Sequence, residues 1–179
     1  ESLTTEVGPR MGGSPEYDRA TAWAQDKFKT LGFDKVWLQP VTFPVWQRHA
    51  ESGRVLSPFP QRLALTALGG SEGTKGAMSA EVVEFASLDA LKAAPEGALN
   101  GKIAFVNLKM ARSKDGSGYG PVSKVGRSGA SEAAKKGAIA IVIRSVGTDS
   151  DRMPHTGMMR YEDGIAKIPA AALSAPDAD

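Results

Sequence analysis

The first part of the chain contains one strongly amphipathic segment. Ser14 offers a hydroxyl that can cap a first turn, and Pro15 suits the first helical position because that position needs no amide donor. Gly32 can adopt the left-handed conformation that ends many helices. We therefore predict a helix over residues 15–31 with one buried stripe. The apolar residues of this stripe are spaced three or four apart: Tyr17, Ala20, Ala24, Phe28 and Leu31.

The predicted helix is followed by a short predicted strand and then by a proline-rich connection. Residues 35–41 predict a short strand, which ends where prolines interrupt regular pairing. Residues 44–60 are polar and punctuated by prolines, which is typical of a connection between two structural units. We therefore expect a front segment over residues 1–45 and a separate domain over residues 46–179.

Short strands dominate the region that follows. Residues 63–68 and 80–85 are predicted strands, separated by the glycine-rich turn over residues 69–76. Ser87 is expected to cap a short helix that runs through Leu91 and ends before Pro95. These short elements predict a domain that is rich in strands.

The clearest pattern lies in the second half of the chain. Residues 102–108 predict a buried strand, 123–136 a helix closed by Gly137, and 138–143 a continuously apolar strand. A strand, a helix and a strand in this order predict a right-handed crossover and a parallel pair of strands. One more strand is expected over residues 167–173.

The last residues have the composition of a helix start. Ser174 is followed by Pro176 and Asp177, which is the pattern of a capped first turn. Since the body of such a helix would lie beyond Asp179, we expect the chain to end at a boundary within a longer protein.

Composition excludes several classes of protein. Hydrophobic residues make up 41% of the chain and charged residues 23%, as in ordinary globular domains. Cysteine is absent, which excludes thiol catalysis and a disulfide framework. The longest apolar run, Ala138–Ile143, is far shorter than the roughly 20 residues of a membrane span. We expect neither a membrane-spanning segment nor an anchor of this kind.

The charge distribution does not favour a nucleic-acid site. The net charge is only +2. One local group is basic, but Tyr119 is the single aromatic residue within it, whereas single-strand binding needs several stacking rings. We interpret the group as a solvated basic loop. Its basic members are Lys109, Arg112, Lys114, Lys124 and Arg127.

Residues for metal or nucleophilic chemistry are scarce. The histidines are His49 and His155, and a protein zinc site uses about four ligands, about three of them from the chain when catalytic. We predict no metal site in these residues. Ser128 lies in a Gly-Arg-Ser-Gly sequence, but Ala130 stands where a nucleophile elbow has its second glycine. Ser128 is therefore interpreted as an ordinary helix residue.

The long loop over residues 146–166 is the candidate functional segment. Loops of this length inside compact domains are uncommon and often functional. His155, Thr156 and Tyr161 are the candidate side chains for facing a substrate. The simpler interpretation is that His155 only holds the loop in place, because a single histidine cannot form a catalytic constellation. Both interpretations stay open at the level of sequence.

Several motifs in fixed order resemble one family. The chain is similar to the amino-terminal part of the plasma glutamate carboxypeptidase family, secreted zinc exopeptidases of the aminopeptidase clan. The resemblance covers nearly the whole chain. The segments that carry it are Leu3–Arg10, Gly101–Ile103, Glu132–Ala138, Ile143–Val146, Pro154–Gly157, Tyr161, Asp163–Gly164 and Lys167–Pro169.

The resemblance implies an α+β architecture in two parts. Residues 1–45 would supply the first helix and strand of the peptidase domain. Residues 46–179 would form a protease-associated domain, a swivelling fold with β/β/α layers. The front helix would then be separated here from the sheet that it normally covers.

The resemblance also implies a function and its partners. Two zinc ions and the catalytic residues would lie after the inserted domain, so this chain alone would be inactive. It would shape access for short peptides, with His155, Thr156 and Tyr161 facing them, and contact the rest of the peptidase domain or a second copy in a homodimer. The parent would be secreted or periplasmic. The alternative is a free-standing peptide- or protein-binding module without enzymatic activity.

Overall fold

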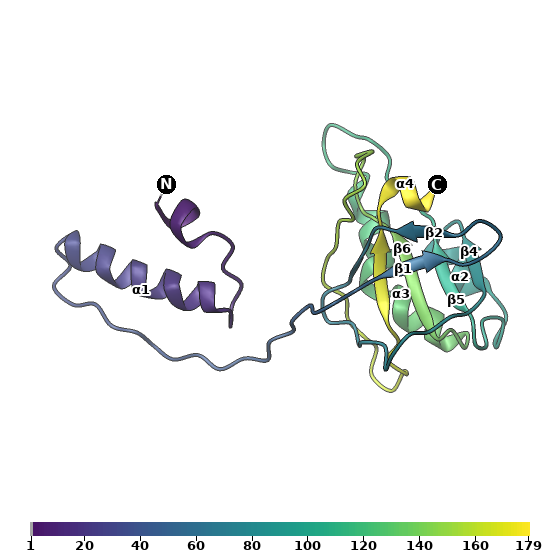
Figure 1. Ribbon diagram of the computed structural model, residues 1–179, viewed down its shortest axis with the longest axis horizontal. Helices are drawn as coiled ribbons and strands as arrows, with labels where there is room; N and C mark the ends of the chain where they lie inside the picture. The colour runs from purple at the N-terminus through teal and green to yellow at the C-terminus, as the bar shows by residue number, and fades with distance from the viewer. Residues whose placement is uncertain (1) are drawn as a thin grey trace. The chain divides into compact units, whose positions relative to one another are not determined.

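The computed structural model describes residues 2–179 and consists of two compact units (Figure 1). The first unit ends at Gln47 and the second begins at Arg48.

The first unit contains the predicted amphipathic helix. A short π-helix, η1 (Leu3–Val7), precedes α1 (Pro15–Thr30). The Ser14 hydroxyl accepts a hydrogen bond from the Tyr17 amide at 3.2 Å, as expected of an N-cap. Acidic residues lie in the first turn of α1 and lysines in the last turn, which suits the helix dipole. The helix prediction is confirmed to within one residue.

The apolar stripe of α1 is not buried, and this part of the sequence-based prediction is wrong for this chain. No residue of α1 is buried within the described structure, and Tyr17, Phe28 and Leu31 are 46 to 62% exposed. A helix of this kind gains most of its stability from what it packs against. α1 therefore lacks its main source of stabilisation.

The predicted strand over residues 35–41 is absent. Residues 35–52 have no regular secondary structure, and Trp37 and Val41 are exposed. A strand needs a partner for its backbone hydrogen bonds, and within residues 2–179 no segment pairs with this one. The apolar residues of this segment were not sufficient to form the strand.

Amide hydrogen exchange is expected to distinguish the two units. Residues 15–31 should exchange at least about two orders of magnitude faster than residues 138–143, because a helix without a packed face opens locally. Exchange mass spectrometry on a dilute monomer measures this difference directly. Equal protection of the two segments would contradict the prediction.

The second unit is built on a five-stranded mixed sheet. Its strand order is β3-β7-β6-β5-β4, with β3 antiparallel at one edge and the other strands parallel. The predicted parallel pair is confirmed, since Ala104 lies opposite Ile141. The strands are β3 (Leu65–Ala67), β4 (Val82–Phe85), β5 (Ile103–Val106), β6 (Ala140–Arg144) and β7 (Ala170–Leu173).

Two helices cover one face of this sheet. Ser87 caps α2 (Leu88–Ala93), as predicted. The helix α3 (Tyr119–Lys135) begins four residues earlier than expected, because Pro121 lies in its first turn, where no amide donor is needed. Gly129 brings α3 close to β6: a Cβ atom at Gly129 would lie 3.1 Å from the Ile141 Cδ1 atom.

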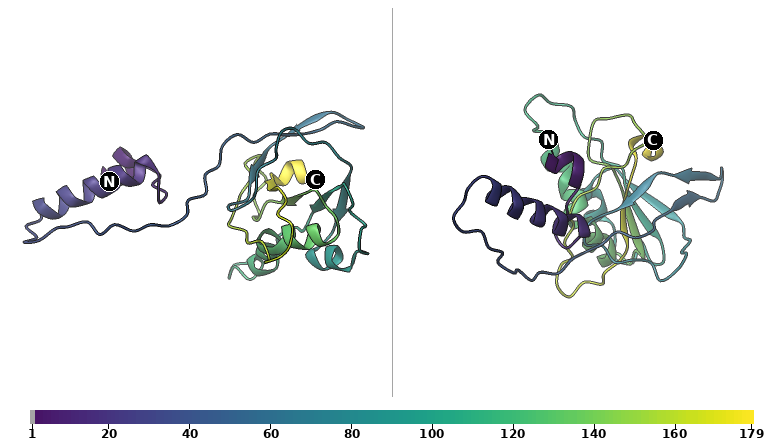
Figure 2. Two further views of the ribbon diagram at one scale, coloured as in Figure 1. Left: turned by 90° about the horizontal axis from the view of Figure 1, so that it is seen from below. Right: turned by 60° about the vertical axis from the view of Figure 1, so that its left-hand side comes forward.

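The opposite face of the sheet carries smaller elements. Side chains alternate along β6, so Arg144 points away from the α3 face that holds Ile141 and Ile143. Arg144 pairs there with Asp179, the residue after α4 (Ala175–Ala178). An unpredicted hairpin of β1 (Gly53–Val55) and β2 (Gln61–Leu63) forms a second sheet. In Figure 2 this hairpin and α3 lie on opposite sides of the large sheet.

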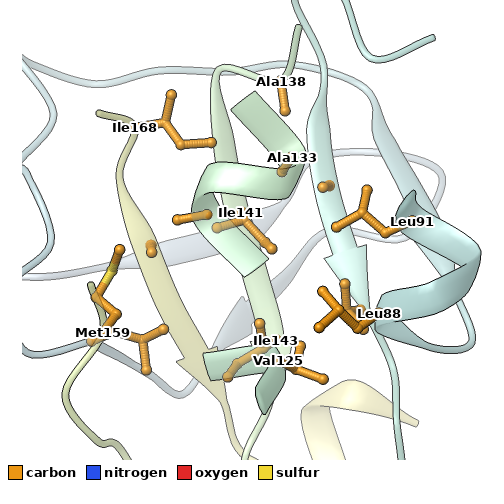
Figure 3. Close-up of a cluster of buried hydrophobic side chains, with 14 of the residues drawn as sticks. Leu88, Leu91, Val125, Ala133, Ala138, Ile141, Ile143, Met159 and Ile168 are labelled. Carbon is orange, nitrogen blue, oxygen red and sulfur yellow. The ribbon is translucent and has the colours of Figure 1, made fainter. Parts of the chain in front are cut away.

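The core lies between the sheet and the helices α2 and α3 (Figure 3). Leu91 and Ile141 are almost completely buried. The side chains come from segments distant in sequence, so the core ties the whole second unit together. Its labelled members are Leu88, Leu91, Val125, Ala133, Ala138, Ile141, Ile143, Met159 and Ile168. The unit is thus a mixed α and β structure with two sheets.

Candidate functional site

A cavity of about 160 Å³ lies where the β6–β7 loop meets α3. Two of the predicted site residues, His155 and Thr156, line it from the loop. Ser123, Gly126 and Arg127 line it from α3. The remaining lining residues are Leu68, Tyr119, Ile143, Val146, Gly157 and Met158. The lining therefore combines apolar residues with hydroxyl groups, an imidazole and a guanidinium group.

Backbone hydrogen bonds hold the loop beside this cavity. The buried Ser145 hydroxyl accepts from the His155 amide at 2.9 Å. The Gly69 amide donates to the Gly157 carbonyl, and the Met159 amide donates to the Gly69 carbonyl, both at 2.8 Å. The Thr156 hydroxyl donates to the Ala67 carbonyl at 3.0 Å. The position of the loop thus depends on its backbone and on Ser145 rather than on the His155 ring.

The His155 ring is the partly exposed titratable group at the edge of the cavity. Its Nε2 atom lies 3.4 Å from the Asp149 Oδ2 atom, and the two side chains are 47% and 62% exposed. An ion pair between groups this exposed contributes little to stability, about 0 to 1 kcal/mol. The ring is therefore placed for contact with a bound molecule at little structural cost.

Tyr161 lies apart from the cavity. Its hydroxyl donates to the Ile168 carbonyl at 2.6 Å and accepts from the Glu72 amide at 2.8 Å. Burial raises the pKa of the Tyr161 phenol above its ordinary value, by more than the hydrogen bond from Glu72 lowers it. The structure thus brings His155 and Thr156 together, whereas the two backbone partners of Tyr161, at Ile168 and Glu72, lie outside the loop over residues 146–166.

The described residues do not form a metal centre. Within residues 2–179, no group of three His, Cys, Asp or Glu side chains gathers closely enough to hold a metal ion. A zinc site therefore does not fit this part of the chain. Ser128 lies inside α3 and donates its hydroxyl hydrogen to the Lys124 carbonyl at 3.0 Å, which confirms its interpretation as a helix residue. Among the same residues no helix has the length and hydropathy to cross a bilayer.

A polar cluster beneath α4 was not anticipated from the sequence. The Asp177 side chain is 3% exposed and accepts from the Arg152 Nε atom at 2.8 Å and from the Ala64 amide. Burial raises the pKa of Asp177, but these hydrogen bonds, with one from the Ser174 side chain, bring it below its ordinary value. Arg144 and Lys109 likewise hold the pKa of Asp179 well below its usual range. This cluster joins α4 to β2 and β6.

Replacement of Asp177 by asparagine tests the cluster. Because the folded-state pKa is lowered, the carboxylate stabilises the fold above its unfolded pKa of about 3.9, and this contribution is lost as the pH falls through the folded value. Asp177→Asn should lower the free energy of unfolding at pH 7 by about 1 to 2 kcal/mol. Urea unfolding should show a smaller difference at about pH 3. The matched control is the exposed Asp163→Asn, and equal losses in both variants would contradict the prediction.

Comparison with known proteins identifies relatives for this architecture. No protein-family model matches the chain. Carboxypeptidase Q from mouse is 37% identical over 178 residues, and that from Xenopus laevis is 39% identical over 174 residues, which are 99% and 97% of this chain. The chain spans about 36% of the length of these relatives.

The similar solved structures are also peptidases. A peptidase M28 precursor from Shewanella amazonensis has 54% sequence identity and a TM-score of 0.92, over 99% of this chain and 40% of that one. An aminopeptidase from Aneurinibacillus and a zinc aminopeptidase from Bacillus subtilis have TM-scores of 0.56 and 0.57 at 21% and 18% identity, and they cover 96% and 99% of this chain and 35% and 38% of their own. The latter two support the fold alone.

These matches confirm the resemblance seen in the sequence. The chain is related along nearly its whole length to peptidases of the M28 class. Its sequence is also similar to carboxypeptidase Q, at 37% identity to the mouse and human proteins.

Proposed function

We propose that the chain is a non-catalytic part of a secreted zinc exopeptidase that hydrolyses short peptides. The observation that carries this proposal is the match to the Shewanella peptidase over 99% of the chain but only 40% of the relative. The larger share of that protein has no counterpart here. Since residues 2–179 form no metal-ligand group, zinc and the catalytic residues would belong to the remainder of the parent.

The two units would have different roles in such a parent. Residues 1–45 would begin the peptidase domain, which would supply the surface that covers the exposed stripe of α1. Residues 46–179 would form the protease-associated domain, as a β/β/α layered fold. The mixed sheet with helices on one face and a hairpin on the other supports this assignment.

The cavity beside α3 is the part of the second unit suited to meet a substrate. His155 and Thr156 would shape substrate access there without taking part in bond cleavage, and Tyr161 would support the loop that carries them. Short peptides, the rest of the peptidase domain and a second copy of the chain are the proposed partners. A secreted or periplasmic parent fits the Shewanella relative, which is described as a precursor.

The open reading frame of the parent gene tests this proposal directly. We expect the residues that follow Asp179 to contain a His-x-Asp motif and then an Asp-Asp-Gly segment, which would supply carboxylate and imidazole ligands for zinc. A reading frame that ends close to Asp179, with no metal-binding segment, would overturn the proposal. That result would favour the free-standing binding module instead.

A further inference from the structure

The cavity between the β6–β7 loop and α3 has an unbalanced charge. Arg127 lines it, whereas none of the described residues in its lining is an aspartate or a glutamate. Within residues 2–179, the Arg127 guanidinium has no ion pair or side-chain hydrogen bond. Asp149 lies 3.4 Å from the His155 Nε2 atom, in a smaller neighbouring pocket that His155 also lines, so the unpaired positive charge of the cavity is that of Arg127. The cavity is therefore chemically suited to a ligand with a negative charge.

The apolar and hydroxyl-bearing residues of the lining indicate which other chemical groups the ligand has. The lining includes Leu68 and Ile143, which are buried core residues, and Val146. The hydroxyl groups of Ser123 and Thr156 are also present in the lining. A carboxylate attached to an aliphatic side chain complements this combination, because guanidinium groups bind carboxylates with two parallel hydrogen bonds.

The volume of the cavity limits the size of the ligand that it can hold. The volume of about 160 Å³ is close to that of cavities of about 150 Å³ that hold one benzene-sized molecule. Pockets for larger ligands have about 300 Å³ or more. The cavity therefore has room for one residue and not for a longer peptide segment.

We propose that this cavity binds the carboxy-terminal residue of a peptide. The carboxylate lies beside Arg127, and an aliphatic side chain rests on Leu68 and Ile143. The inference rests on the proposed function, because it assigns to the cavity the kind of molecule that a peptidase meets. Since the lining offers no carboxylate for an ammonium group, an acylated residue binds better than a free amino acid.

A titration of the isotope-labelled 179-residue chain tests this proposal. The ligands are N-acetyl-leucine, its carboxamide N-acetyl-leucinamide, and free leucine, followed through the amide resonances of Gly126 and Gly157. N-acetyl-leucine should bind with a Kd of about 1 to 10 mM, as expected for a ligand of this size. The carboxamide and free leucine should each bind about tenfold more weakly.

Variants on α3 provide the matched control. Arg127→Gln should weaken binding of N-acetyl-leucine about tenfold. Lys124→Gln removes the same charge one turn away, outside the lining, and should leave the Kd unchanged. If Arg127→Gln does not fold, the three ligands on the unchanged chain still decide the question.

Three results would overturn the proposal: equal affinity for acid and carboxamide, equal weakening by the two variants, or no shifts up to about 50 mM ligand, well above the expected Kd. None of them bears on whether the parent is a zinc peptidase, because the open reading frame tests that separately.

Discussion

Ile141→Ala is expected to lower the free energy of unfolding of the second unit by about 3 to 4 kcal/mol, within the range for large-to-small changes in a core. Ile141, the second residue of β6, is 1% exposed. Its neighbours across the sheet are Ala104 and Ala170, and Gly129 of α3 faces it. Because these neighbours are small, they cannot fill the space that the isoleucine leaves. A cavity then remains, and its cost adds to the lost burial.

Val142→Ala is the matched control, since Val142 is the next residue of β6 and points to the opposite, half-buried face. It should cost less than about half as much, because less apolar surface leaves contact. Chemical denaturation, followed by circular dichroism in the far and near ultraviolet, would measure the free energy of unfolding of both variants. Similar losses would show that the packing between β6 and α3 is not the main stabilising contact of this unit.

His155→Ala in the full-length enzyme is expected to raise KM several-fold to tens-fold, with a smaller change in kcat. A group that contacts substrate in both the ground state and the transition state affects binding more than the chemical step. The scale is that of one lost hydrogen bond, about 1 to 2 kcal/mol. The structure predicts little change in stability, since the loop is held through the His155 amide and the ring has only an exposed partner, Asp149.

Ser145→Ala is the counterpart of this experiment. It removes the buried hydroxyl that accepts from the His155 amide, so it should lower the melting temperature by more than His155→Ala does. Steady-state kinetics and thermal unfolding of both variants separate the two roles. If His155→Ala leaves KM unchanged and reduces stability, the ring holds the loop and the substrate-facing role is wrong.

Helix starts with a serine cap were predictable from the sequence because their interactions are local, whereas α3, which has no side-chain cap, begins four residues before the predicted start. Ser14, Ser87 and Ser174 each accept a hydrogen bond from the amide three residues further along, as the capping pattern requires. The apolar strand over residues 138–143 and its parallel partner were predictable for a related reason. A continuously apolar run has to be covered on both faces, and the intervening helix supplies one cover.

Interactions between segments that are distant in the sequence were harder to predict. The strand expected over residues 35–41 did not form, because a local run of apolar residues cannot indicate whether a pairing partner exists. The hairpin of β1 and β2 was missed since its strands are short and largely polar. The cluster around Asp177 joins it to Ala64 and Arg152, and no spacing in the sequence indicates that contact.

In the candidate site, too, the local features were predictable from the sequence and the contacts between segments were not. The length of the β6–β7 loop indicated a functional segment, and His155 and Thr156 do line a cavity. Arg127 was recognised only as part of a basic group, because its position beside His155 depends on how α3 packs against the loop. Tyr161 was grouped with His155 by proximity in sequence, yet its hydroxyl is bonded to the backbone at Ile168 and Glu72.

Zinc content and peptide hydrolysis of the isolated chain, measured beside the full-length protein, test the central claim most directly. The 179-residue chain should hold no stoichiometric zinc after gel filtration and should cleave no aminoacyl or dipeptide substrate above a mock preparation, because residues 2–179 gather no set of three ligands. The full-length protein should bind zinc and turn over the same substrates. One tightly held zinc ion per isolated chain, or turnover by that chain, would contradict the account.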